Sequence, residues 1–333
     1  MRVTMGRALW LAGLLAVFGL CLSQTGALAQ TQGQAWPNRQ IRFIVAFPAG
    51  GLTDLFARAY GDHIAQRTGQ TVVVENRPGA YGSIAAQAVL AAPADGYTFL
   101  FALTGTLVQN RILIKNLPYD PDRDFVLISS MFSGHLPFIV AKSTGVQNLK
   151  EFVEYARTRD ISVGTWGAGS AAHIVVNELN KQYGLKLVPV HYRGEAQMWQ
   201  DFSAGVLQAG MGSYVIASSV LESGAGRAIA VPSPKRMKKM PDVATFIEQG
   251  ATSKYFGLKG CICLVGARGT PPEIVERLSE LMVEGGKSER VQKILETFAV
   301  DEAAQGAADF RREYEAEKPI WLELVKDLNI APQ

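Results

Sequence analysis

The chain has 333 residues, of which 48% are hydrophobic, and a formal net charge of +3 at pH 7. This length allows two domains of ordinary size, each with its own core. A charge so close to zero does not give the strong positive potential typical of nucleic-acid-binding proteins, so we expect no nucleic-acid partner.

The first residues have the pattern of a secretory signal peptide. Two arginines near the start precede an apolar stretch from 8 to 22 and an Ala-Leu-Ala cleavage pattern that ends at Ala29. The stretch is short for a membrane span. We therefore predict a signal peptide over 1–29, cleavage after Ala29 and a periplasmic protein. A lipid anchor at Cys21 is the alternative, and the bulky Leu20 before it disfavours this reading.

The stretch from 41 to 54 predicts a binding loop. An apolar strand over 41–47 runs into Pro48-Ala49-Gly50-Gly51, and a helix is expected to begin at Thr53-Asp54. The first N–H groups of a helix have no partner within the helix, and they lie at the positive end of its dipole. Such a place suits an anion without any Lys or Arg. An ordinary strand-to-helix turn is the alternative.

The chain from 41 onwards alternates strand and helix patterns, which predicts parallel sheets covered by helices. The expected strands are 41–47, 71–75, 97–103, 125–131, 137–141, 161–165, 186–191, 206–211, 227–231 and 261–265. The expected helices are 53–68, 83–91, 149–158, 170–183, 196–203, 214–221, one around 274–282, and 307–328 with an interruption near Pro319. The strand 227–231 is a candidate for returning the chain to the first domain. Ligands of open parallel sheets bind beyond the carboxyl ends of the strands.

Cysteine and histidine give no metal-binding pattern. Cys261 and Cys263 would point to one side of a strand with poor disulfide geometry, so we predict free, buried thiols. The four histidines are too scattered for a metal site. We predict no metal and no cofactor. The basic cluster 235–239 is expected to be a solvated loop, with a docking patch as the alternative.

Eight segments follow one another along the chain: WPNRQIRFIVAFPAGGLTD, TVVVENRPGAYGS, DGYTFLFALTGT, NLPYDPDRDF, GAGSAAHI, VHYRGEAQ, PDVATFIEQG and GARGTPPEIVERL. In this order they resemble the Bug family, the periplasmic substrate-binding components of tripartite tricarboxylate transporters. The resemblance implies an α/β, two-lobed Venus-flytrap fold of type II, each lobe a sheet flanked by helices. It places lobe 1 at 36–133 and 234–333, and lobe 2 at 134–233.

The resemblance also implies a function. The protein would capture a small organic mono- or dicarboxylate in a cleft between the lobes and deliver it to the membrane permease subunits of a tripartite tricarboxylate transporter. We expect a monomer. A ligand-dependent sensor that presents its bound state to a membrane receptor is the alternative, because both roles need the same liganded form.

In lobe 1 the resemblance implies a binding loop and its neighbours. The loop residues are Phe47, Ala49, Gly50, Gly51, Leu52, Thr53 and Asp54. Backbone N–H groups around Gly51 would meet a carboxylate, whereas Asp54 is expected to cap neighbouring N–H groups or order water. The hydroxyls of Thr104 and Thr106 suit carboxylate or water contacts, and Tyr81 is expected at the rim.

In lobe 2 the implied site comes from three loops. Its residues are Trp166, Gly169, Ser170, His173, Arg193, Gly194, Glu195, Ala196 and Ser213. Ser170 is either an N-cap alone or a ligand contact, and Arg193 is either a bidentate clamp or a surface charge. His173 is expected to pack rather than bind. Trp166 faces the cleft or lies behind its loop.

Two lobe 2 positions depart from the family pattern. The family often has an acid after the strand 206–211, where this chain has Gly212-Ser213, which puts amino-acid ligands in doubt. Glu195 would repel an anion unless it meets a donor on the ligand or points to solvent.

An enzyme is the less favoured class. The segment 167–172 resembles the dinucleotide pattern G-x-G-x-x-A, but the next strand ends without the expected acid. The chain has no G-x-S-x-G nucleophile elbow. We therefore predict a binding protein without catalytic residues.

Overall fold

The computed structural model describes residues 36–332. The predicted signal peptide and its cleavage site lie outside these residues. Arg39–Gln333 form one compact unit. Within the described part of the chain, no helix is both long and apolar enough to cross a membrane.

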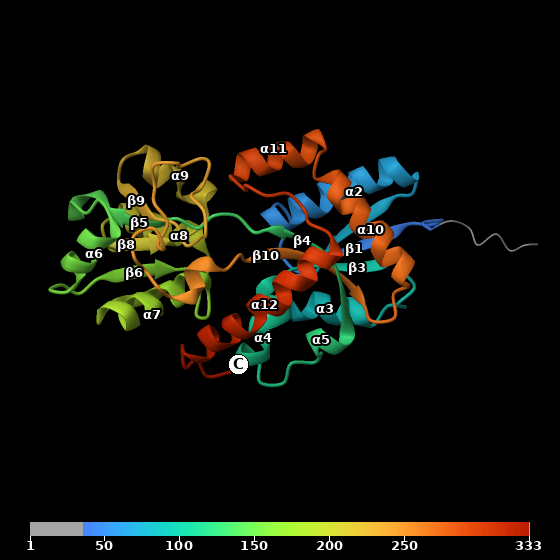
Figure 1. Cartoon of the computed structure of the whole chain (residues 1–333), viewed down its shortest axis with the longest axis horizontal. Helices are drawn as coiled ribbons and strands as arrows, with labels where there is room; N and C mark the ends of the chain where they lie inside the picture. Colours follow the sequence, from blue (N-terminus) through green and yellow to red (C-terminus); the bar gives the residue numbers. More distant parts are fainter. Residues whose placement is uncertain (1–35, 333) are drawn as a thin grey trace, which may run out of the picture. The chain divides into compact units, whose positions relative to one another are not determined.

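The first sheet holds five strands in the order β2-β1-β3-β10-β4 (Figure 1). Its strands are β1 Ile41–Val45, β2 Val72–Asn76, β3 Thr98–Leu103, β4 Phe125–Phe132 and β10 Cys261–Ala267. β1 runs parallel to β2 and β3, whereas β10 pairs antiparallel with both β3 and β4. Four of the five residues of β1 are buried, as expected for a strand covered on both faces.

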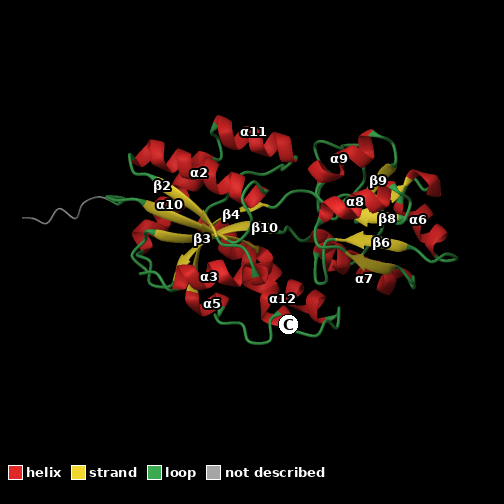
Figure 2. Cartoon of the chain, turned by 180° about the vertical axis from the view of Figure 1, so that it is seen from behind, coloured by secondary structure: helices red, strands yellow, loops and turns green. Residues whose placement is uncertain are grey.

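Helices of the N-terminal and C-terminal parts of the chain surround this first sheet (Figures 1 and 2). They are α2 Leu52–Thr68, α3 Ser83–Leu90, α4 Asn110–Leu113, α5 Pro121–Asp124, α10 Pro272–Gly285, α11 Glu289–Phe298 and α12 Ala307–Lys326. Two short helical turns, η1 Ala80–Gly82 and η2 Gly105–Gln109, follow β2 and β3. The apolar face predicted for 274–282 is confirmed, since Ile274, Leu278 and Met282 are buried.

The second sheet also has five strands, in the order β7-β6-β8-β5-β9. They are β5 Phe138–Ala141, β6 Ser162–Thr165, β7 Val188–His191, β8 Ala209–Met211 and β9 Gly226–Ala230. β6 is parallel to β7 and β8, and β5 is antiparallel to β8 and β9. The accompanying helices are α6 Leu149–Ala156, α7 Ala171–Tyr183, α8 Glu195–Ser203 and α9 Tyr214–Glu222, with η3 Lys142–Thr144 and η4 Lys254–Gly257.

Three predictions about the elements are wrong. Neither sheet is wholly parallel. In the first sheet β10 runs antiparallel to its neighbours, and in the second sheet β5 does. The strand predicted at 227–231 does not return to the first sheet but pairs with β5 in the second as β9. The helix predicted to break near Pro319 is continuous as α12.

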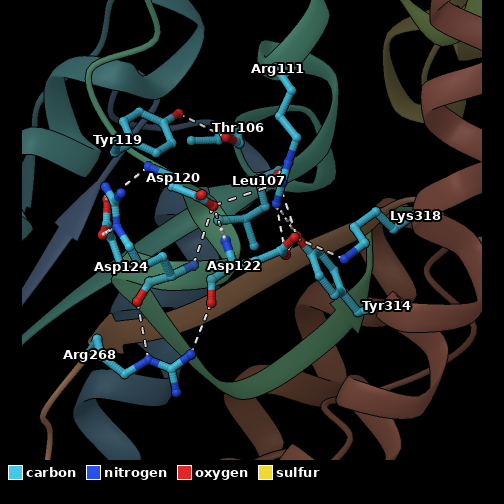
Figure 3. A network of polar contacts seen from close by, with 11 residues as sticks. Thr106, Leu107, Arg111, Tyr119, Asp120, Asp122, Asp124, Arg268, Tyr314 and Lys318 are labelled. Atoms are coloured by element: carbon cyan, nitrogen blue, oxygen red, sulfur yellow. Dashed lines mark hydrogen bonds and ion pairs between the residues drawn. The ribbon is translucent and has the colours of Figure 1, made fainter.

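Contacts on both sides of Pro319 hold α12 in place. Asp122 accepts from Arg111 at 2.7 Å, from the Tyr314 hydroxyl at 3.1 Å and from Lys318 at 2.9 Å (Figure 3). Just beyond the proline, Trp321 is buried. Tertiary contacts of this kind outweigh the hydrogen bond that a proline removes from a helix.

Candidate functional site

The predicted ligand residues fall on one edge of each sheet. β1, β2 and β3 are parallel neighbours, so the loops after them meet at one edge, and β6, β7 and β8 do the same in the other sheet. We call the loops 46–53, 77–82 and 104–106 the first edge. The loops 166–170, 192–195 and 212–213 form the second edge.

Asp54 stabilises the loops of the first edge through hydrogen bonds and an ion pair. Its carboxylate accepts from the Gly50 N–H at 2.9 Å, from Asn76 Nδ2 at 2.9 Å and from Arg58 Nη2 at 3.0 Å. Asn76 also donates to the carbonyl of Phe47 at 3.0 Å, which fixes the other end of the loop. The expectation that Asp54 caps neighbouring N–H groups is therefore confirmed, because Asp54 is 2% exposed and its carboxylate is turned inward.

The charge of Asp54 is balanced within the protein. Burial alone would raise the pKa of Asp54, but the hydrogen bonds from Arg58, Gly50 and Asn76 outweigh it and hold the pKa below its ordinary value. The carboxylate therefore stays ionised, and the positive charge of Arg58 compensates its negative charge.

The N-terminus of α2 leaves backbone donors open. Gly51 is the N-cap and supplies no side chain, and among the described residues no acceptor meets the N–H groups of Gly51, Leu52 and Thr53. Gly50, at φ 84°, takes the left-handed turn that glycine favours, whereas Gly51 is extended at φ −76°. A Cβ added at Gly51 would meet no atom closer than 3.6 Å. A side chain at position 51 would therefore meet neither a steric clash nor an unfavourable φ.

Tyr81 lies on an exposed left-handed turn of the first edge. Ala80 and Tyr81 have φ of 45° and 52°, and Tyr81 is 48% exposed. The Tyr81 carbonyl accepts from Thr106 Oγ1 at 3.1 Å and from Asn110 Nδ2 at 3.0 Å. These bonds hold a conformation that L-residues rarely adopt.

The two threonine hydroxyls are engaged within the protein. Thr106 is 1% exposed and donates its hydroxyl proton to the Tyr81 carbonyl. Thr104 Oγ1 accepts from the Cys261 N–H at 2.8 Å, so it fastens β10 to the end of β3. Cys261 and Cys263 are free, as predicted, with Cys263 buried and Cys261 partly so.

The second edge carries a pair of histidines. Ser170 caps α7 by accepting from the His173 N–H at 3.3 Å, which confirms its predicted N-cap role. The rings of His173 and His191 lie 4.6 Å apart edge to face, and His191 Nδ1 is 2.7 Å from Thr165 Oγ1. Burial and the nearby His191 lower the pKa of His173 to about 4. The ring of His173 is therefore neutral at pH 7 and packs as expected.

Glu195 joins two loops of the second edge. It is the first residue of α8, and its Oε2 accepts from both the N–H and the hydroxyl of Ser213, at 2.8 and 2.9 Å. Burial raises the pKa of Glu195, and the bonds from Ser213 and the nearby Trp199 indole act against that rise. The chain has no acid after β8, yet Glu195 brings a carboxylate to that place from α8.

Arg193 and Trp166 complete this edge. The Arg193 side chain is exposed and, within the described residues, forms no hydrogen bond or ion pair. Trp166 is partly buried and packs against the core, closer to the interpretation that places it behind its loop. Gly194 has φ 121°, and Ala196 is exposed in the first turn of α8. Gly169 lies against Leu113, since an added Cβ would meet its methyl groups at 3.1 Å.

A large cavity lies elsewhere. A groove of about 1050 Å³ is lined by residues of α10, of the start of α12 and of the loop before α10, including Val283, Ala307 and Thr270. None of the predicted ligand residues lines it. The first turns of α10 and α12 border this groove, but the Ala307 N–H already donates to Ser279 Oγ at 2.8 Å. We therefore place the candidate site at the two edges, where the predicted ligand residues lie. Among the described residues, no group of three potential metal ligands comes together.

Four residues that contact or adjoin the loops of the two edges were not predicted from the sequence: Arg58, Asn76, Asn110 and His191. Asn76 and His191 end parallel strands, and that position was a usable signal. Arg58 and Asn110 act from one helical turn beyond their loops, and nothing in the loop sequence itself pointed to them.

Two mixed sheets, each flanked by helices, define the two-lobed α/β class of periplasmic solute-binding proteins. The model of the tripartite tricarboxylate transporter family receptor matches residues 56–330, and the chain belongs to this family. A UPF0065 protein of Bordetella bronchiseptica is 34% identical over 271 residues, which are 80% of this chain and 77% of the relative's own length.

Solved structures agree with this assignment. R. palustris Rpa4515 with adipate is 30% identical, covers 90% of this chain and 100% of its own, and has a TM-score of 0.76. MatC from Rhodopseudomonas palustris, with bound malate, is 26% identical, covers 87% and 100%, and has a TM-score of 0.69. The predicted fold class and family are confirmed.

Proposed function

We propose that this protein binds a small organic carboxylate between the first and second edges and delivers it to a membrane permease of the tripartite tricarboxylate transporter type. The structural relatives Rpa4515 and MatC, which hold adipate and malate, support the ligand class. The family supports the transport role. The proposed partner is therefore a set of permease subunits, and the protein acts without catalysis in the periplasm.

One observation supports this proposal most strongly. The N–H groups of Gly51, Leu52 and Thr53 meet no acceptor among the described residues, while the nearby Asp54 is neutralised by Arg58. A carboxylate would find donors and the positive end of the α2 dipole there, without a competing side-chain anion.

Calorimetry of the exported protein tests the proposal with mono-, di- and tricarboxylates and with neutral sugars of similar size. At least one carboxylate is expected to bind, and saturation at a hundred times Kd should stabilise the fold by about 2.7 kcal/mol. Tight binding of a sugar, with no signal from any carboxylate, would refute the proposal.

The variant Gly51→Val locates the site. Its side chain has room, so the fold should persist while the branched methyls cover the N–H groups. Gly257→Val is the matched control, because Gly257 is exposed, has no neighbour within 4 Å of an added Cβ and lies in η4, away from both edges. Wild-type affinity in Gly51→Val would remove this loop from the site.

A further inference from the structure

We propose that Glu195 selects the far end of the ligand: its carboxylate accepts a hydrogen bond from an ammonium or hydroxyl group of the bound acid and disfavours a second carboxylate. This inference rests on the proposed function and deepens it. The two carboxylate oxygens of Glu195 differ in their hydrogen bonding.

Oε2 of Glu195 is fully engaged, whereas Oε1 is not. Oε2 accepts from the Ser213 N–H at 2.8 Å and from the Ser213 hydroxyl at 2.9 Å. Within the described chain, Oε1 has no hydrogen-bond partner, and no cation lies within ion-pair distance of the carboxylate. The indole of Trp199 lies close by and helps to stabilise the charge, but its Nε1–H makes no hydrogen bond of normal geometry. A partly buried carboxylate therefore has acceptor capacity that the protein does not fill.

The same contacts occupy the N-terminus of α9. Ser213 is the N-cap of this helix, yet its hydroxyl turns to Glu195 instead of capping the helix. The Ser213 N–H, which would otherwise be open to an external anion, is taken by the protein's own carboxylate. A ligand carboxylate at this place would lose that donor and face a negative charge.

Arg193 does not cancel this charge. It lies two residues earlier in the same loop, but the structure places no ion pair between Arg193 and Glu195. The Arg193 side chain is exposed, and Oε1 of Glu195 remains available to a donor. The second edge is thus suited to the donor end of a ligand whose carboxylate lies at the first edge.

Matched pairs of acids test the inference by calorimetry: succinate with 4-aminobutanoate, glutarate with 5-aminopentanoate, and adipate with 6-aminohexanoate. At the chain length that binds best, the wild-type protein should prefer the amino acid by at least about tenfold. Glu195→Gln keeps an acceptor for Ser213 but removes the charge. It should lower this preference at least about tenfold, with tighter binding of the dicarboxylate.

Glu222→Gln is the matched control, because it removes a carboxylate from the other end of α9, where the described residues give Glu222 no hydrogen bond or ion pair. It should leave the ratio unchanged. A wild-type preference for the dicarboxylate, or a ratio that Glu195→Gln does not move, overturns the inference while leaving carboxylate binding intact. Failure of all these acids to bind overturns it as well, and failure of the wider carboxylate panel overturns the proposed function too. If Glu195→Gln does not fold, the wild-type ratio alone decides.

Discussion

The two edges differ in how their charges are satisfied. At the first edge Asp54 is paired with Arg58 and turned inward, and what remains open is a set of uncharged N–H groups. At the second edge Arg193 has no partner in the described chain, and Glu195 keeps one oxygen free. In the proposed site the first edge would hold the carboxylate common to all ligands, whereas the second edge carries the charges that would distinguish one carboxylate from another.

The largest expected effect comes from breaking the inner support of the first edge. Asp54→Ala leaves Arg58, Asn76 and the Gly50 N–H without their acceptor, and should lower the free energy of unfolding by roughly 1.5–3 kcal/mol. The loop then loses its shape, and carboxylate affinity should fall about 100-fold. Denaturant unfolding and calorimetry measure both quantities.

Glu75→Gln is the control for this change. Glu75 also accepts from two arginines, but its side chain is 36% exposed, so its removal should cost less than about 1 kcal/mol. Equal effects of the two substitutions on affinity would contradict the special role of Asp54.

A similar loss of affinity, without the loss of stability, is expected at the second edge. If the unpaired guanidinium of Arg193 meets the ligand, Arg193→Ala should weaken binding by about 1.5–3 kcal/mol, and Arg193→Lys by less. Calorimetry with the best-binding carboxylate distinguishes the two variants. Negligible losses in both would mean that Arg193 is a surface charge and that the comparison between the edges rests on Glu195 alone.

The histidine pair gives the second edge a pH dependence. Burial and His191 lower the pKa of His173 to about 4 in the folded chain, from an ordinary value of 6.5. Between these two pH values the imidazole is therefore protonated in the unfolded chain but not in the folded chain. The contribution of His173 to stability should therefore be lost as pH falls through this range. NMR titration of the His173 ring measures the pKa, and a value near 6.5 would contradict the burial seen here. Because burial is the larger cause, His191→Asn should raise the pKa of His173 only part of the way to its ordinary value.

Trp166 should give the smallest signal. Because it packs against the core, its fluorescence should respond weakly to ligand, and Trp166→Phe should leave the ranking of carboxylates unchanged. A large ligand-induced change that disappears in Trp166→Phe would place the indole in the site and make it a further selectivity residue.

The local strand and helix pattern was predictable because apolar runs and glycine breaks are local signals. Ser170 as an N-cap and Asp54 as a loop cap also follow from their positions at helix starts. The antiparallel entry of β10 and β5 was not predictable, since their partners are far away in the chain. Glu195 shows the same limit: its role depends on Ser213, 18 residues further on, and only the folded chain reveals that Oε2 is used and Oε1 is not.

The anion-binding role of the first edge is tested most directly by following its backbone amides by NMR during titration with a carboxylate and with its neutral primary amide. We predict that the amide protons of Gly51, Leu52 and Thr53 shift downfield with the acid, and much less with the amide, because they form charge-assisted hydrogen bonds with the carboxylate. If these resonances stay in place while the carboxylate binds elsewhere, the anion-binding role of the first edge is wrong.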